Sequence, residues 1–169
     1  MVDWPGLGAV PPSDDVQSFD DLVRLARTHL DGPTVVVAQS MGGVVALRLA
    51  LDPSATVTHL VLCATSGGLD VASLGANDWR RDYRQRWPSA PAWAFDPVDD
   101  MTSELASLGA PTLLLWARDD PVSPVAVGRR LASLLPAATL TVLEAGDHSF
   151  ASTLASEVAP LISEHLAKP

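Results

Sequence analysis

The sequence is poor in the residues that would tie it to a disulfide scaffold, a membrane span or a metal centre. Cys63 is the one cysteine among 169 residues, which excludes an internal disulfide. It stands in the apolar run HLVLCAT, which predicts a small buried hydrophobe rather than a nucleophile. No apolar run reaches the roughly 20 residues that span a bilayer, and no metal-ligand spacing occurs, so we expect neither a metal nor an organic cofactor.

Basic residues are also scarce. Lys and Arg number 11 against 20 Asp and Glu, and the net charge of −9 argues against nucleic-acid or anionic-membrane partners. The opening MVDWPGLGAVPP lacks the basic start and apolar core of a signal peptide, so we expect a cytoplasmic location. With 47% hydrophobic and 18% charged residues, the chain is typical of one globular domain over residues 1–169.

The main pattern in the sequence is that apolar runs alternate with segments of helical periodicity. Four β-branched-rich runs are almost continuously apolar, which is typical of parallel strands covered on both faces: 34–39, 57–64, 111–117 and 138–145. Between and beside them lie helical patterns at 16–30, with a capping box at Ser18–Asp21, and at 43–51, 124–135 and 154–166. This order predicts an α/β fold, a doubly wound and mostly parallel sheet with helices on both faces.

One segment, 66–110, separates two strands by more than a normal crossover. It carries Trp79, Trp87 and Trp93, which favour packing over disorder, so we expect a small, mostly helical cap over the end of the sheet. Candidate substrate contacts here are Thr65, Ser66, Trp87 and Trp93, although a plain hinge and cap packing are the alternatives. The arginines Arg80, Arg81, Arg84 and Arg86 indicate either an anionic substrate or, more simply, the solvated face of a helix.

A lone serine interrupts the apolar stretch VVVAQSMGGVVAL, residues 35–47. Ser40 follows a predicted strand and precedes a predicted helix, a variant of the G-x-S-x-G nucleophile elbow. Such a tight turn needs small residues two before and two after the serine, and Ala38 and Gly42 meet that need. It also directs the N–H of Met41 to the place where an oxyanion would form. A tolerated serine in a buried turn is the simpler alternative.

Two later strand ends supply possible partners for Ser40. Asp119 and Asp120 follow strand 111–117, and His148 follows strand 138–145 in a glycine-opened loop. Ligands of doubly wound sheets meet the carboxyl ends of the strands. The order serine, acid, histidine along successive strand ends therefore predicts a catalytic triad.

With these motifs the chain resembles the α/β-hydrolase superfamily, in particular small esterase-like and C–C-hydrolase-like members with a short cap. DWPGLG, residues 3–8, is similar to the family's D-x-P-G-x-G segment. The resemblance implies a triad of Ser40, Asp120 and His148, with spacing after Ala117 favouring Asp120 over Asp119. The sequence departs from the family pattern at Ala38, at Gln39, where histidine is frequent, and at Ala117.

A larger departure concerns the N-terminal side. Family members carry further strands and a His-Gly-type loop upstream of the D-x-P-G-x-G segment, and that loop gives the second oxyanion donor. We therefore expect a fragment, a mis-started reading frame, or self-association through the exposed edge of strand 34–39.

Three functions compete. The first is a serine hydrolase acting on a small-molecule carboxylic ester or related acyl substrate through an acyl-enzyme. The second keeps the triad but serves as a thioesterase, an acyltransferase or a C–C bond hydrolase. The third is an inactive or binding-only domain, because the expected oxyanion loop is absent.

Overall fold

The computed structural model describes residues 4–168, so Asp3 of the DWPGLG segment lies outside the described residues. A four-stranded parallel sheet forms the centre, in the order β1-β2-β3-β4. Its strands are β1 Thr34–Gln39, β2 Val57–Cys63, β3 Thr112–Ala117 and β4 Ala138–Leu143. The predicted strands and the α/β class are confirmed. Because all strands are parallel, their carboxyl ends lie along one edge, which is where the candidate residues begin.

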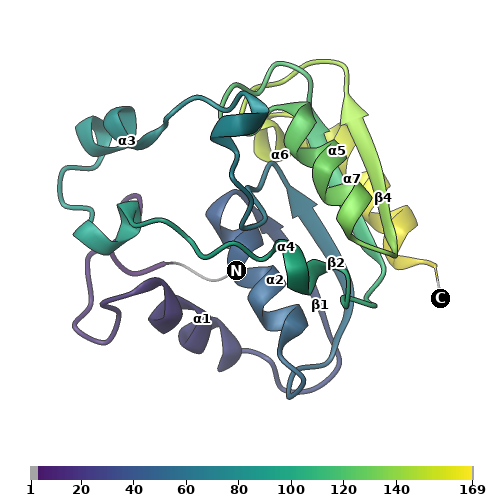
Figure 1. Ribbon diagram of the computed structural model, residues 1–169, viewed down its shortest axis with the longest axis horizontal. Helices are drawn as coiled ribbons and strands as arrows, with labels where there is room; N and C mark the ends of the chain where they lie inside the picture. The colour runs from purple at the N-terminus through teal and green to yellow at the C-terminus, as the bar shows by residue number, and fades with distance from the viewer. Residues whose placement is uncertain (1–3, 169) are drawn as a thin grey trace.

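Helices cover both faces of this sheet (Figure 1). On one face α2 (Met41–Leu51) and α5 (Val125–Leu134) bury a core that includes Leu47, Leu62, Trp116 and Leu131. On the other face α6 (Phe150–Thr153) and α7 (Ala155–Leu166) pack on the sheet, where Phe150 of α6 and Val158 of α7 share a core with Val61 and Leu115. Helices therefore shield both faces of the central strands β2 and β3 from solvent. This explains why the sequences of these two strands are continuously apolar.

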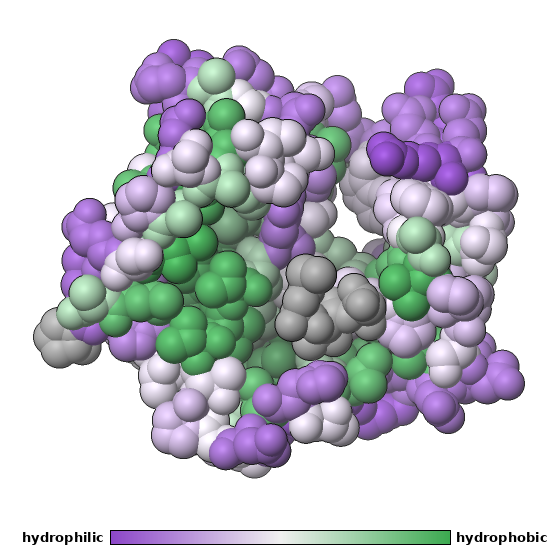
Figure 2. Space-filling model, turned by 180° about the vertical axis from the view of Figure 1, so that it is seen from behind, coloured by the Kyte–Doolittle hydropathy of each residue, from purple (hydrophilic) through white to green (hydrophobic). Residues whose placement is uncertain are grey.

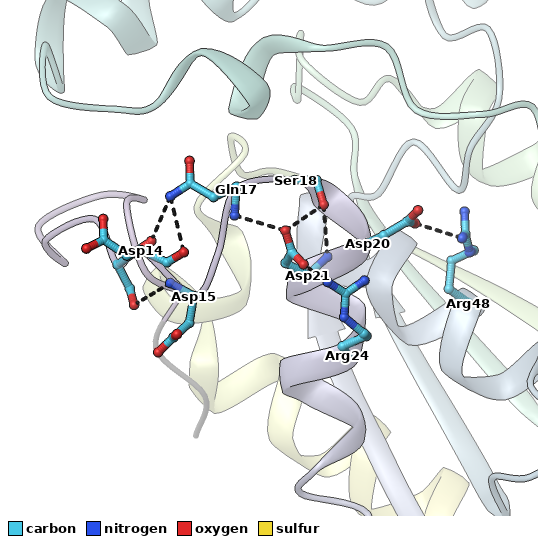
Figure 3. A network of polar contacts seen from close by, with 9 residues as sticks. Asp14, Asp15, Gln17, Ser18, Asp20, Asp21, Arg24 and Arg48 are labelled. Atoms are coloured by element: carbon cyan, nitrogen blue, oxygen red, sulfur yellow. Dashed lines mark hydrogen bonds and ion pairs between the residues drawn. The ribbon is translucent and has the colours of Figure 1, made fainter.

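The predicted N-cap Ser18 is present at the start of α1 (Phe19–Arg27), but the return bond of the capping box goes to Gln17 and not to the N–H of Ser18 (Figure 3). Ser18 Oγ accepts the N–H of Asp21 at 3.2 Å, and Asp21 Oδ2 in turn accepts the N–H of Gln17 at 3.0 Å. Asp20 pairs with Arg48 of α2 at 2.9 Å. These contacts fix the first turn of α1 against α2.

Segment 66–110 is less helical than expected. Its short helices occupy less than half of it: η1 (Ala72–Leu74), α3 (Arg80–Arg86), η2 (Ala92–Phe95) and α4 (Thr102–Leu105). Pro88, Pro91 and Pro97 limit helix length because proline lacks the N–H that a helix interior uses. In Figure 1 this segment runs beside the N-terminal segment, and the Gly8 N–H donates to Tyr83 Oη of α3 at 2.8 Å.

Strand β1 lies at the edge of the described sheet, as expected from the family strands that are missing upstream of it. Its apolar run predicted a strand covered on both faces, and that expectation is wrong for β1, because one face of this edge strand is exposed. Val35 is 42% exposed and Val37 is 53% exposed, and they are the large hydrophobic side chains exposed within residues 4–168. Figure 2 shows hydrophobic surface gathered on the side of the molecule away from the view of Figure 1. Within the same residues, every helix is too short or too polar to cross a membrane.

Candidate active site

The turn between β1 and α2 holds Ser40 in an unusual conformation. Its φ is 53° and its ψ is −126°, a region that non-glycine residues occupy at a cost of about 1–3 kcal/mol. The Ser40 N–H donates to the Cys63 carbonyl at 2.9 Å, which ties the turn to β2. A Cβ on Gly43 would lie 2.5 Å from Thr65 Cβ, so glycine is required there for α2 to begin so close to the sheet. The backbone thus holds the hydroxyl at the strand end.

A chain of hydrogen bonds runs from Ser40 to Asp120. Ser40 Oγ lies 2.8 Å from His148 Nε2, and His148 Nδ1 lies 2.8 Å from Asp120 Oδ2. Asp120 is 2% exposed, and its other oxygen accepts the N–H groups of Val122 at 2.8 Å and Ser123 at 3.0 Å. The buried carboxylate is therefore fully hydrogen-bonded, which holds it in place beside the imidazole.

The choice between the two adjacent acids is settled by position. Asp119 is exposed, whereas Asp120 is buried and faces His148. The turn after β3, in which the Asp120 N–H approaches the Ala117 carbonyl at 3.4 Å, points Asp120 inward. The structure therefore brings together the three residues that the sequence singled out, Ser40, Asp120 and His148.

Two further residues of this site, Ser123 and Gln39, were not predicted from the sequence. Ser123, 2% exposed, donates from Oγ to the Thr65 carbonyl at 3.1 Å and accepts from Trp116 Nε1 at 3.1 Å. Gln39 Nε2 donates to the His148 carbonyl at 2.5 Å. No local pattern marks either contact, since each joins segments that only the sheet brings together; Gln39 stood out only as a departure from the family pattern.

Met41 is the first residue of α2, so its N–H has no acceptor within the helix. The helix macrodipole places partial positive charge at the same end. An oxygen that becomes negative beside Ser40 would meet this N–H. The indole Nε1 of Trp4 lies close by, 3.9 Å from where a Cβ on Gly42 would stand.

Two cavities meet at Ser40, Met41 and His148. The larger has a volume of about 610 Å³ and is also lined by Ser66, Arg80 and Trp93. The smaller, about 440 Å³, is walled by Trp4, Leu7, Val10 and Tyr83. Both volumes suit a small organic ligand, for which pockets of roughly 300–1,000 Å³ are usual.

The candidate substrate contacts divide into two pairs. Ser66 and Trp93 line the larger cavity, as predicted. Thr65 does not, because it is fully buried beneath the start of α2 and its Oγ1 accepts the Gly67 N–H at 3.2 Å. Trp87 is also outside both cavity linings; it ends α3, and the Arg86 guanidinium lies 5.6 Å from its ring. The expectation that Thr65 and Trp87 contact substrate is therefore corrected.

The arginines of α3 mostly face solvent. Arg81 pairs with neighbouring Asp82 at 3.0 Å with both side chains exposed, and Arg84 stacks over Phe95 at 4.0 Å. Arg80 differs because it lines the larger cavity, where Asp78 pairs with it at 3.2 Å. The solvated-face interpretation thus fits most of the group.

The remaining titratable groups in the core are inert or structural. Cys63 is 2% exposed, and burial raises the pKa of its thiol to about 12. His165 is 6% exposed, and its ring centroid lies 5.5 Å from that of His59. Burial, and then the neighbouring His59, lower the pKa of His165 below its usual value.

The sequence model of the "Alpha/beta hydrolase family" matches residues 1–161. The chain belongs to this family. Membership in this family confirms the expectation that the protein is a hydrolase.

Individual relatives agree with the family assignment. A stretch of 50 residues is 46% identical to the "Putative carbamate hydrolase RutD" of Pseudomonas syringae pv. syringae (strain B728a), covering 30% of this chain but only 19% of that protein. A thermophilic esterase from Thermogutta terrifontis shares 23% identity with a TM-score of 0.72 over 97% of this chain and 77% of its own. A meta-cleavage product hydrolase from Pseudomonas fluorescens IP01 shares 19% identity with a TM-score of 0.69 over 95% and 76%. These two likenesses show that this alpha/beta hydrolase shares their fold.

Proposed function

We propose that this alpha/beta hydrolase cleaves a carboxylic ester or a related acyl compound through a Ser-His-Asp triad. The single observation that carries the proposal is the hydrogen-bonded chain from Ser40 through His148 to Asp120, with both bonds at 2.8 Å. A serine held at φ 53° at a strand end supports it further, because a backbone conformation of this cost persists only where the surrounding structure enforces it.

The chemistry follows from the atoms present. Ser40 Oγ forms a bond to the carbonyl carbon while its proton moves to His148 Nε2, and the carbonyl electron pair becomes an oxyanion. When the oxyanion collapses, the leaving alcohol departs with the proton from His148. A water molecule then attacks the acyl carbon and loses a proton to His148. The bond from the acyl carbon to Ser40 Oγ breaks, the acid is released, and His148 returns the proton to Ser40 Oγ. Asp120 accepts a hydrogen bond from Nδ1 throughout and stabilises the imidazolium.

Met41 is proposed to stabilise the oxyanion. Its N–H is free of helical acceptors and stands at the positive end of α2. Removal of one such donor costs on the order of 10²–10³ in rate where it has been measured. This N–H belongs to the backbone, so a side-chain substitution does not remove it.

Segment 66–110 is proposed to act as the cap of a single domain. Trp79 and Ala94 line both cavities together with Ser40 and His148, so the segment forms a wall of the reaction space. Ser66 and Trp93 are the proposed substrate contacts within it. A wall of this kind excludes water from the acyl-enzyme and selects the substrate shape.

A fluorophosphonate probe tests the triad directly. We expect Ser40 to be labelled in the native chain, Ser40→Ala to abolish labelling, and His148→Ala to slow it strongly. A well-folded chain that remains unlabelled would contradict the proposal and favour a binding-only domain.

A substrate panel then separates the reactions that share this triad. p-Nitrophenyl esters of graded chain length, matching thioesters and a vinylogous diketone should be compared under the same conditions. The structural likeness to a meta-cleavage product hydrolase keeps carbon–carbon bond hydrolysis as the second candidate. Turnover of the diketone with negligible ester turnover would replace the first proposal with the second.

A further inference from the structure

Gln39 links Ser40, which it directly precedes, to His148, the residue proposed to accept the proton of Ser40. It is the last residue of β1 and directly precedes Ser40. Its Nε2 donates to the backbone carbonyl of His148 at 2.5 Å, although the two residues are 109 positions apart in sequence. Gln39 also lines the smaller cavity beside Ser40 and His148. The contact therefore links the strand of the nucleophile to the backbone of the base.

The placement of His148 needs such a link, because its loop starts far from Ser40. His148 follows β4, whereas Ser40 follows β1, and strands β2 and β3 lie between them. Neighbouring strands are about 4.7–4.9 Å apart, which puts β4 on the order of 14 Å from β1. The loop after β4 therefore carries the imidazole of His148 past the carboxyl ends of β3 and β2 to reach Ser40.

Apart from the bond between His148 Nε2 and Ser40 Oγ, the other hydrogen bonds of this loop do not reach β1. The Ser149 N–H donates to Asp147 Oδ1 at 2.8 Å, and the Phe150 N–H donates to the Asp147 carbonyl at 3.1 Å. Both bonds are local to the loop. Asp120 holds the ring of His148 from β3 but does not hold its backbone. Gln39 is the contact that fixes the backbone of His148 at β1.

We propose that Gln39 is a positioning residue that sets the distance between His148 Nε2 and Ser40 Oγ. This rests on the proposed function for its effect on catalysis, but the positioning itself concerns the loop. Without the Gln39 N–H, the His148 carbonyl loses its tether and the imidazole moves relative to the hydroxyl. A displacement of about 1 Å in a reacting geometry can cost on the order of 10² in rate.

Two substitutions and one control test the proposal kinetically. Gln39→Leu removes the donor at similar size, and Gln39→His retains a ring N–H donor. Gln85→Leu is the matched control, because Gln85 is exposed on α3 and lines neither cavity. We expect Gln39→Leu to lower kcat about 10–100-fold with KM within about 2-fold, and Gln39→His to recover most of the loss. An equal loss in Gln39→His would make Gln39 a packing residue and overturn the proposal.

Amide hydrogen exchange supplies a readout that does not depend on turnover. In Gln39→Leu we expect the amides of Ser149 and Phe150 to exchange at least about 5-fold faster, while the amides of β3 keep their protection. Unchanged exchange together with unchanged kcat overturns the proposal. If the parent chain turns over no substrate, faster exchange confined to residues 146–150 still supports the tether, and it is then the proposed function that fails.

Discussion

The two halves of the candidate site are built differently. The strand-end half consists of Ser40, Asp120 and His148, each following its own strand and joined to the next by a hydrogen bond of 2.8 Å. The loop-built half consists of residues 4–10 and 79–94, which wall the cavities. Between these two segments, the polar contact is the bond from the Gly8 N–H to Tyr83 Oη.

This difference separates two tasks. The strand-end half has its geometry imposed by the sheet, and in the proposed mechanism the rate of bond cleavage depends on it. The loop-built half is held by packing, for example where a Cβ on Gly6 would lie only 2.9 Å from Pro91 Cδ. We therefore expect changes in the first half to act on kcat, and changes in the second to act on KM and substrate choice.

The largest effect is expected from His148→Ala. It removes the group that accepts the proton of Ser40, so kcat should fall on the order of 10⁵–10⁶-fold with a folded protein. Ester hydrolysis under saturating substrate measures it. His29→Ala is the control, because His29 is exposed near the end of α1. A loss of less than about 10² for His148→Ala would show that the strand-end half does not carry the rate.

Asp120→Asn should follow, with a loss in kcat on the order of 10⁴-fold, since the amide cannot stabilise the imidazolium or hold the same tautomer. The neighbouring Asp119→Asn changes the same charge at an exposed position and should stay within about 2-fold. Parallel kinetics of the two variants provide the comparison. Equal losses in both would mean that overall charge, and not the His148 contact, matters.

Tyr83→Phe tests the loop-built half. It deletes the oxygen that accepts the Gly8 N–H, so the wall of the smaller cavity should loosen. One hydrogen bond is worth roughly 0.5–1.5 kcal/mol, which corresponds to an increase in KM of about 2–10-fold. Michaelis kinetics on esters of graded length should show kcat within about 2-fold. A fall in kcat at constant KM would erase the distinction between the two halves.

Self-association through β1 remains a prediction, and Val37→Lys addresses it. Val37 is 53% exposed on the edge strand, and a lysine there should disfavour pairing. Light scattering after size exclusion should then show a shift toward monomer. Thr139→Lys, an exposed position on the opposite edge strand β4, is the matched control. A parent chain that is monomeric at all concentrations would contradict the prediction.

The smallest effect is expected in the pH dependence of the free energy of unfolding, through His165 of α7. Burial lowers the pKa of His165 in the folded state, so below pH about 6.5 the unfolded chain binds a proton that the folded chain resists. Stability should therefore fall as the pH drops through that range. Urea unfolding from pH about 7.5 to about 5.5 measures the slope. His165→Leu should flatten it, and an unchanged slope would assign the acid sensitivity to other groups.

Much of the strand-end half could be predicted from the sequence. The continuous apolar runs mark the strands, although β1 is covered on one face only, and the small residues Ala38 and Gly42 mark a tight turn around Ser40. Parallel strands bring their carboxyl ends to one edge, which is why an acid at position 119 or 120 and His148 could be placed beside Ser40 from the sequence. Helix α1 and its N-cap Ser18 were predictable from local sequence.

The loop-built half could not be predicted as well. Trp87 of the loop-built half and Thr65, just before segment 66–110, were expected to face substrate, but a side chain's direction in an irregular segment depends on what packs against it. Thr65 is buried because α2 begins directly over it, and the helices of segment 66–110 are short because prolines interrupt them.

The sequence by itself determined which segments form the strands, the turn that holds Ser40, and the residue types available as acid and base. These follow from periodicity and local sterics, which act over a few neighbouring residues. Only the tertiary structure decided that Asp120 rather than Asp119 faces the histidine, that Ser123 supports the acid loop, and that Gln39 holds the backbone of His148. Those contacts join residues from different strand ends, so they exist only once the sheet has brought the ends together.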